Sequence, residues 1–204
     1  PIITLRTNVK VGSVFENEYV GSGISHYVEH LVAGGSTTLK SEQDYQETLS
    51  LLGGVSNAYT TYDHTSYFIN TSPNYLKTAL ETLYEWMFFS AFDDTEVARE
   101  KEVITREIEK NLVNKHRIAF YHAQQNTFKT HPIYYPVIGY KENFLSLQKD
   151  HLLDFYQKYY RASNMILVIG GPVDIAHTKT LIDNTFAKAK TLAPPVYPSF
   201  VEPL

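Results

Sequence analysis

The sequence of 204 residues predicts an α+β fold, in which helices pack against a single, mostly antiparallel (mixed) sheet of about four to six strands. Three observations lead to this prediction. Apolar and polar residues alternate near the N-terminus, two runs rich in Tyr, Thr, Phe and Ile flank a short turn, and a continuous apolar run lies near the C-terminus. Between them, apolar residues recur at helical spacing behind capping residues.

The predicted strands are four. Residues 2–12 alternate, which is typical of a half-buried strand, and one side carries Ile3, Leu5, Val9 and Val11. Residues 55–61 and 65–71 are joined by three residues and form a predicted hairpin. Residues 165–169 are apolar throughout and are followed by Gly-Gly-Pro, which indicates a strand buried on both faces.

The predicted helices span residues 22–32, 42–52, 73–92, 94–128, 147–160 and 174–189. Ser41 is a predicted N-cap with Asp44 in the first turn of its helix, and Gly53 ends that helix. Asp93 with Glu96 three residues later indicates a capping box. The long helix that follows is expected to continue past Leu112, with a kink, toward Phe128.

Composition limits the domain count and the partners. The length suits one large domain or two small ones, and 43% hydrophobic residues are enough for a sizeable core. We expect one domain over residues 1–192 and a Pro-rich tail, or the start of a linker, over 193–204. The formal net charge of −4 argues against nucleic acid or an anionic membrane as the main partner.

The absence of cysteine excludes a disulfide framework and a thiolate metal site. No apolar run approaches the ~20 residues that a membrane span needs, and the N-terminus does not resemble a targeting peptide. We therefore expect a soluble protein, either cytoplasmic or, after removal of a targeting segment, periplasmic or organellar.

Residues 26–30, His26-Tyr-Val-Glu29-His30, form the pattern H-x-x-E-H on a predicted helix. Residues four apart on a helix differ by about 40° in direction, so His26 and His30 can reach one metal ion. Glu29 lies beside that pair, close enough to accept a proton from a water on the metal. The alternative for two histidines on an amphipathic helix is packing or solvation.

A catalytic zinc needs a third protein ligand, which is a histidine or a carboxylate from another element. Glu100 and Glu107 lie seven residues apart on the predicted inward face of the long helix, marked by Val97, Ile104 and Ile108. Burying carboxylates is costly unless they meet a cation or hydrogen-bond donors. Two glutamates on the same inward face suggest that both meet one positively charged group, whereas a single glutamate could extend its carboxylate to solvent.

These residues resemble the inverzincin metallopeptidases, the family of pitrilysin, insulin-degrading enzyme and mitochondrial processing peptidase. The likeness rests on Gly23-Ile-Ser-His26 through His30, on the segment from Glu100 to Glu107, and on Leu52 through Tyr67. It implies a metallopeptidase-like domain in which His26, His30 and Glu107 bind Zn²⁺, Glu29 is the general base and Glu100 supports the site.

The resemblance further implies that Asn57 and Ala58 lie on a strand to which a peptide substrate adds. From the residues alone, Asn57 is a turn or strand-end residue. Family members often have a phenylalanine three residues after the second histidine, whereas this chain has Ala33, so the adjoining subsite is expected to differ. Family enzymes also use a second, similar domain or subunit that closes a chamber around the substrate.

The expected function is therefore a zinc metalloendopeptidase domain. It would hydrolyse short or unfolded peptides with a zinc-activated water, and as an isolated domain it could be inactive. A non-catalytic, zinc-binding scaffold subunit of a peptidase-like complex is the alternative, and zinc storage or sensing is a third hypothesis that would not need Glu29. The sequence leaves the substrate and the compartment open.

Overall fold

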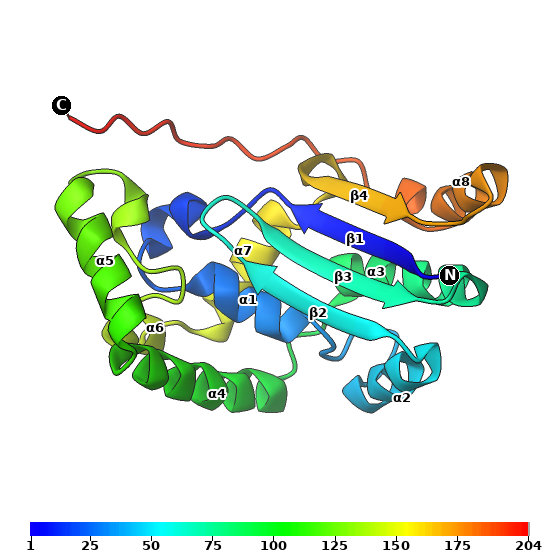
Figure 1. Ribbon diagram of the computed structural model, residues 1–204, viewed down its shortest axis with the longest axis horizontal. Coiled ribbons are helices and arrows are strands. Elements are labelled where there is room, and N and C mark those ends of the chain that lie inside the picture. Colours follow the sequence, from blue (N-terminus) through cyan, green and yellow to red (C-terminus); the bar gives the residue numbers. More distant parts are fainter. Residues whose placement is uncertain (204) are drawn as a thin grey trace.

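The computed structural model describes residues 1–203, which form one four-stranded sheet with helices packed against it (Figure 1). The strand order is β2-β3-β1-β4, and every neighbouring pair is antiparallel. The strands are β1 Ile3–Val9, β2 Val55–Thr60, β3 Thr65–Thr71 and β4 Met165–Gly170. This arrangement confirms the predicted α+β class and the antiparallel sheet.

Eight α-helices accompany the sheet in the part of the chain that the structure describes, and the outer face of the sheet stays exposed. They are α1 Ile24–Val32, α2 Glu42–Leu52, α3 Leu76–Phe89, α4 Asp94–Leu112, α5 Lys115–Thr127, α6 Lys141–Leu145, α7 Lys149–Tyr159 and α8 Ile175–Asn184. α1 and α3 lie against the sheet, whereas α4 and α5 lie farther out, beyond α1 (Figure 1). The short helix α6 was not expected from the sequence.

β1 is a central strand, paired with β3 on one side and β4 on the other, and its alternating apolar residues are buried on one face of the sheet. Ile3, Leu5 and Val9 are fully buried, as the period-two pattern predicted. Leu5 stands between Ile69 of β3 and Ile169 of β4 in the sheet register. The sheet thus presents one apolar face, on which α1 and α3 pack.

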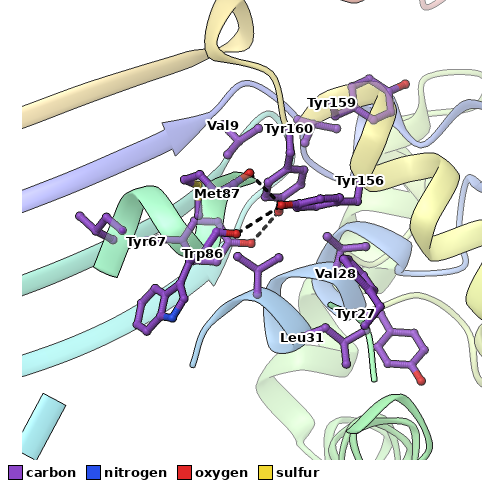
Figure 2. Close-up of a cluster of buried hydrophobic side chains, with 14 of the residues drawn as sticks. Val9, Tyr27, Val28, Leu31, Tyr67, Trp86, Met87, Tyr156, Tyr159 and Tyr160 are labelled. Carbon is purple, nitrogen blue, oxygen red and sulfur yellow. Dashed lines mark hydrogen bonds between the residues drawn. The ribbon is translucent and has the colours of Figure 1, made fainter. Parts of the chain in front are cut away.

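The core behind this face is unusually rich in tyrosine, and its hydroxyl groups are paired (Figure 2). The hydroxyl groups of Tyr67 and Tyr160 lie 2.6 Å apart, and Tyr156 donates to the carbonyl oxygen of Met87 at 2.9 Å. Buried tyrosines need such partners because an unpaired hydroxyl costs free energy. Val28 and Leu31 of α1 pack into the same cluster, which fixes the helix against the sheet.

The capping prediction for α2 is confirmed. Ser41 accepts a hydrogen bond from the backbone N–H of Asp44 at 3.2 Å, and the Asp44 carboxylate accepts one from the Ser41 N–H at 2.8 Å. Gly53, with φ +59°, ends the helix in the left-handed conformation that glycine adopts most readily.

The capping box predicted for α4 is wrong. Asp93 does cap the helix, accepting from the backbone N–H of Thr95 at 2.9 Å. Glu96, however, is buried, and its carboxylate accepts from the backbone N–H of Ser36, at 3.0 Å for its Oε2. The loop after α1 offers a donor that the sequence does not reveal, and Glu96 ties that loop to α4.

The expected long helix with a kink is two helices. α4 ends at Leu112, and Asn114 begins α5 by accepting hydrogen bonds from the backbone N–H groups of His116 and Arg117. An asparagine at this position favours a new helix start because its side chain replaces the missing backbone acceptors.

β4 is an edge strand and is not buried on both faces, contrary to the prediction. Ile166 is 65% exposed and Val168 is 49% exposed, while Met165, Leu167 and Ile169 point toward the helices. The continuous apolar run therefore does not distinguish a central strand from an edge strand whose outer face is also apolar.

The predicted tail, residues 193–204, packs across the domain as far as the structure describes it; Leu204 lies outside the described residues. Tyr197 donates to the backbone oxygen of Lys10 and to Asn164, and Glu202 accepts backbone N–H groups from residues 129–131. No helix within residues 1–203 is both long and apolar enough to cross a membrane.

Candidate metal centre

α1 presents His26, Glu29 and His30, and the local sequence sets its start. Gly23 precedes the helix with φ +73°, and a Cβ atom there would lie 2.1 Å from the carbonyl oxygen of Ile138. Only glycine fits such a site. Because Val28 and Leu31 point into the core, the two histidines, four residues apart, lie on the face that meets α4.

His26, His30 and Glu107 form a cluster whose candidate ligand atoms all lie within 4.8 Å of one another. The Nε2 atoms of His26 and His30 are 3.8 Å and 3.9 Å from one Glu107 oxygen. Ligands on the corners of a tetrahedron around one zinc ion stand roughly 3.4 Å apart, so small side-chain movements would suffice. Two imidazoles and a carboxylate are a donor set that suits zinc, and these three residues can hold it.

Glu100 lies on α4 about two turns before Glu107, where it contacts His30. Its carboxylate is 3.0 Å from Nδ1 of His30, and it also accepts a hydrogen bond from Nε of Arg99 at 3.1 Å. The bond with His30 lowers the pKa of Glu100 below its usual value. With Nδ1 engaged, His30 directs Nε2 toward Glu107, which is the way carboxylates commonly orient metal-binding histidines.

The two histidines differ in their electrostatic surroundings. Burial lowers the pKa of His26 to about 3, and the positive charges of His30 and Arg117 act in the same direction. Burial lowers the pKa of His30 too, but the Glu100 hydrogen bond and the charge of Glu29 outweigh it and raise the pKa above 6.5. His26 is therefore neutral at pH 7, the state in which imidazole binds a metal.

Glu29 is buried beside this cluster, with 6% of its surface exposed. One carboxylate oxygen accepts a hydrogen bond from the hydroxyl of Thr60 on β2 at 2.7 Å. Burial raises the pKa of Glu29, although the Thr60 hydrogen bond and the charge of His30 oppose the shift. A carboxyl group that gains and loses protons closer to neutrality is suited to act as a general base.

Two cavities meet at Glu29. The smaller one, about 290 Å³, borders His30, the segment Ala33–Gly35 and the carboxylates of Glu42, Glu96 and Glu100. The larger one, about 460 Å³, borders His26, Glu107 and three side chains of α5: Arg117, Phe120 and Tyr121. Ala58 of β2 borders both. Ala33, which stands where family members often have phenylalanine, thus lies in the wall of the smaller cavity.

Asn57 and Ala58 lie on β2, which is an edge strand next to α1 (Figure 1). The side-chain oxygen of Asn57 accepts a hydrogen bond from the backbone N–H of Ala58 at 2.9 Å. Because the edge of β2 carries backbone groups that β3 does not use, an extended peptide can pair with it. The role of Asn57 and Ala58 in substrate binding stays a prediction.

Sequence reasoning missed Thr60, Arg99 and Arg117. Thr60 follows Ala58 by two residues and therefore points to the same side of β2, toward Glu29. Arg99 joins Glu100 to Glu42 on α2, at 3.1 Å and 2.8 Å. Arg117 could not be placed from the sequence because its direction depends on the break between α4 and α5.

Comparisons with known proteins identify the family of the chain. Residues 2–141 match the family model described as insulinase (peptidase family M16), and residues 146–203 match the one described as peptidase M16 inactive domain. A Rickettsia felis protein named as an uncharacterized zinc protease is 30% identical over 92% of this chain and 45% of its own length.

Two further proteins show the range of similarity. Human cytochrome b-c1 complex subunit 1 is 28% identical over 85% of this chain and 36% of its own length. The crystal structure of a protease from Helicobacter pylori superposes with a TM-score of 0.89 at 27% identity, covering 98% of this chain and 48% of that one. The chain thus spans about half the length of these relatives or less.

Proposed function

Because the chain belongs to the insulinase family of peptidases (family M16), we propose that it is the zinc-binding half of a metalloendopeptidase that cuts short or unfolded peptides. One observation carries this proposal. The ligand atoms of His26, His30 and Glu107 converge within 4.8 Å, and the buried carboxylate of Glu29 stands beside them where two cavities meet.

The assignment of roles follows from the contacts. His26, His30 and Glu107 would hold the zinc ion, and Glu100 would keep His30 in position. The chemistry that zinc supplies in such a site is Lewis acidity, which polarises the scissile carbonyl and makes water more acidic. The first two ligands come from one helix and the third from another, so the packing of α1 on α4 sets the site.

Glu29 would move the protons. It accepts one from the attacking water and passes it to the nitrogen of the leaving amine. Thr60 holds one carboxylate oxygen, which leaves the other available for the transfer. The raised pKa of Glu29, caused by burial, suits a group that must hold the proton between these two events.

The substrate would bind as an added strand along β2. Main-chain hydrogen bonds to an edge strand need an extended peptide, so folded proteins are excluded and short or unfolded peptides are favoured. Asn57 and Ala58 lie at the point of β2 that borders the smaller cavity. The hydrogen bond between the Asn57 side chain and the Ala58 N–H would open to receive the peptide.

A second homologous domain or subunit would complete the enzyme. The relatives are about twice as long as this chain, and residues 146–203 match a second family model, which is described as peptidase M16 inactive domain. We propose that residues 1–192 form the active half and that residues 193–204 lead toward the rest. The other half would close a chamber around the peptide.

A scaffold function is the second candidate, favoured by the similarity to a cytochrome b-c1 complex subunit. In that case zinc binding, if retained, would serve assembly and not hydrolysis. The two candidates differ over Glu29, because a scaffold has no use for a buried carboxylate beside the donor set. Burying an unneeded ionisable group costs free energy.

The test is cleavage of an unfolded peptide by the intact protein that carries this chain, with zinc present, removed by a chelator and restored. Glu29→Gln should lower kcat by roughly 10²–10⁴-fold, the usual contribution of a general base, while the zinc content stays unchanged. The matched control is Glu102→Gln on α4, whose exposed carboxylate pairs with Arg106 at 3.8 Å on the solvent side of the helix. Full activity of Glu29→Gln would remove the general-base role, and zinc-bound wild type that cuts no peptide would favour the scaffold.

A further inference from the structure

The larger cavity beside Glu29 contains a positive charge that the proposed chemistry does not use. It borders His26, Glu29 and Glu107 on one side and Arg117 with two aromatic residues of α5 on the other. It adjoins Ala58 to Thr60 of β2 and the turn residues Thr61 and Tyr62, whereas the smaller cavity adjoins Ser56 to Ala58. A peptide paired with β2 would cross Glu29 and place side chains in both cavities.

α5 positions this arginine. Asn114 caps the helix by accepting hydrogen bonds from the backbone N–H groups of His116 and Arg117. Arg117 and Tyr121 are four residues apart and Phe120 is three from Arg117, so the three share one face of the helix. That face lines the cavity, and Phe120 is 53% exposed there. Lys115, in the first turn of α5, does not line it.

Arg117 makes no ion pair within residues 1–203. The other basic residues near the site do: Arg99 contacts Glu42 and Glu100, and Lys141 contacts Glu109. The carboxylates that border the cavity with Arg117 are Glu29 and Glu107. The first is bonded to Thr60, and the second belongs to the metal donor set. The guanidinium group is therefore available to an incoming ligand.

The smaller cavity has the opposite character. Glu42, Glu96 and Glu100 stand in its wall, and its single arginine, Arg99, already bridges two of them. A negative group would be repelled there and attracted to Arg117. The two cavities on either side of Glu29 thus differ in the charge that they accept.

We propose that Arg117, with Tyr121 beside it, makes the larger cavity a substrate subsite for a carboxylate group of the peptide. A guanidinium group matches a carboxylate with two parallel hydrogen bonds, and a tyrosine hydroxyl can donate a third. The carboxylate is either an Asp or Glu side chain near the cleaved bond or the free end of the chain. This proposal rests on the proposed function, since the subsite is defined by the peptide on β2.

The experiment uses the intact zinc-loaded protein and unfolded fluorogenic peptides that differ only in Glu or Gln at each position around the cleaved bond. A second pair differs in a free or amidated C-terminus and so distinguishes the two sources of carboxylate. At one position we expect the Glu peptide to have about tenfold higher kcat/KM than the Gln peptide, the size of a partly exposed charge-assisted hydrogen bond. This preference should fall as salt is added.

Arg117→Gln should abolish the preference for the Glu peptide over the Gln peptide. Arg117→Glu should reverse the charge preference, so that a peptide with Lys at the same position is cut best, an outcome that a merely structural role would not produce. Lys115→Gln, on the same helix, should keep it. A wild type without preference for either carboxylate, or a preference that survives Arg117→Gln, would overturn the subsite. If none of the peptides is cut, the proposed peptidase function fails. Fluorescence anisotropy then measures how tightly the same peptides bind, and the ratio of affinities for the Glu and Gln peptides, compared between wild type and Arg117→Gln, decides the role of Arg117.

Discussion

Two buried glutamates, one before α1 and one in its last turn, differ in ways that show what makes a buried carboxylate functional. Glu16 is 1% exposed and Glu29 is 6% exposed, and burial raises the pKa of both. Burial and a raised pKa therefore do not separate them. Their neighbours do.

Glu16 serves the start of the helix. One carboxylate oxygen accepts a hydrogen bond from the backbone N–H of Ser25 at 3.0 Å, and the N–H groups of Gly21 and Gly23 also interact with it. The N–H of Ser25 is one that the first turn of a helix leaves unpaired, and the two glycines lead into that turn. Glu16 borders neither of the two cavities that meet at Glu29, so it supports the helix and does not meet a substrate.

Glu29 has the opposite arrangement. It accepts one side-chain hydrogen bond, from Thr60, and borders both cavities and the His26–His30–Glu107 cluster. The lesson is that access to a cavity beside the metal-ligand cluster marks the reactive carboxylate. Three changes test this contrast.

The largest expected effect is on the pH dependence of the unfolding free energy, and it comes from Glu16. Its pKa is raised to about 8 in the folded protein against 4.5 for the ordinary group, so the folded state holds the proton more tightly. This contribution is fully present below pH 4.5 and is lost as the pH rises through about 8. Relative to Glu16→Gln, the wild type should lose on the order of 3 kcal/mol of unfolding free energy over this range.

Urea denaturation of both proteins at pH 5 and pH 8 measures this difference. Glu18→Gln, at a nearby residue that is not buried, serves as the control. Parallel pH dependence in wild type and Glu16→Gln would show that Glu16 is ionised in the folded protein at both pH values, which contradicts the raised pKa.

The second effect concerns the support of the metal cluster. Glu100→Gln keeps the shape of the side chain but weakens the bond that orients His30. Removing such a partner typically lowers metal affinity by about 10- to 100-fold. Competition with a zinc chelator measures the affinity, and Glu102→Gln on the exposed face of α4 should leave it unchanged. An unaltered affinity in Glu100→Gln would show that His30 is held by packing alone.

The smallest effect concerns the bond to Glu29. Thr60→Val removes the hydroxyl that donates to Glu29 at 2.7 Å, while it keeps the branched shape. We expect about a tenfold lower kcat, because a hydrogen bond to a charged group contributes roughly 1.5 kcal/mol. Thr60→Ser should restore the rate. If Thr60→Val acts on KM alone, Thr60 contacts the peptide and does not position Glu29.

Much of the fold could be predicted because its signals are local. The alternation in β1, the cap of Ser41 and the glycine after α2 each depend on neighbouring residues. The helical register also predicted that Glu100 and Glu107 share the inward face of α4, whereas the choice of Glu107 as the partner of His26 and His30 came from the family resemblance.

Most of the failures involve contacts between distant segments; the break between α4 and α5 at Asn114 is a local exception. Glu96 turns to Ser36 instead of completing a capping box, because the loop after α1 offers it a backbone donor. Ile166 and Val168 are exposed although the run is apolar, since the strand order decides which strand lies at the edge. Thr60 and Arg117 gain their positions only when β2 and α5 meet α1.

The central claim is that one zinc ion binds to His26, His30 and Glu107, next to Glu29. Anomalous diffraction at the zinc edge, from crystals of the zinc-loaded intact protein, tests it most directly. We predict a single strong peak at this site, about 2.0–2.2 Å from a nitrogen of each histidine and from a Glu107 oxygen, with Glu29 outside the ligand set. A peak held by Glu100 in place of Glu107, or no peak at the two histidines, would contradict the account.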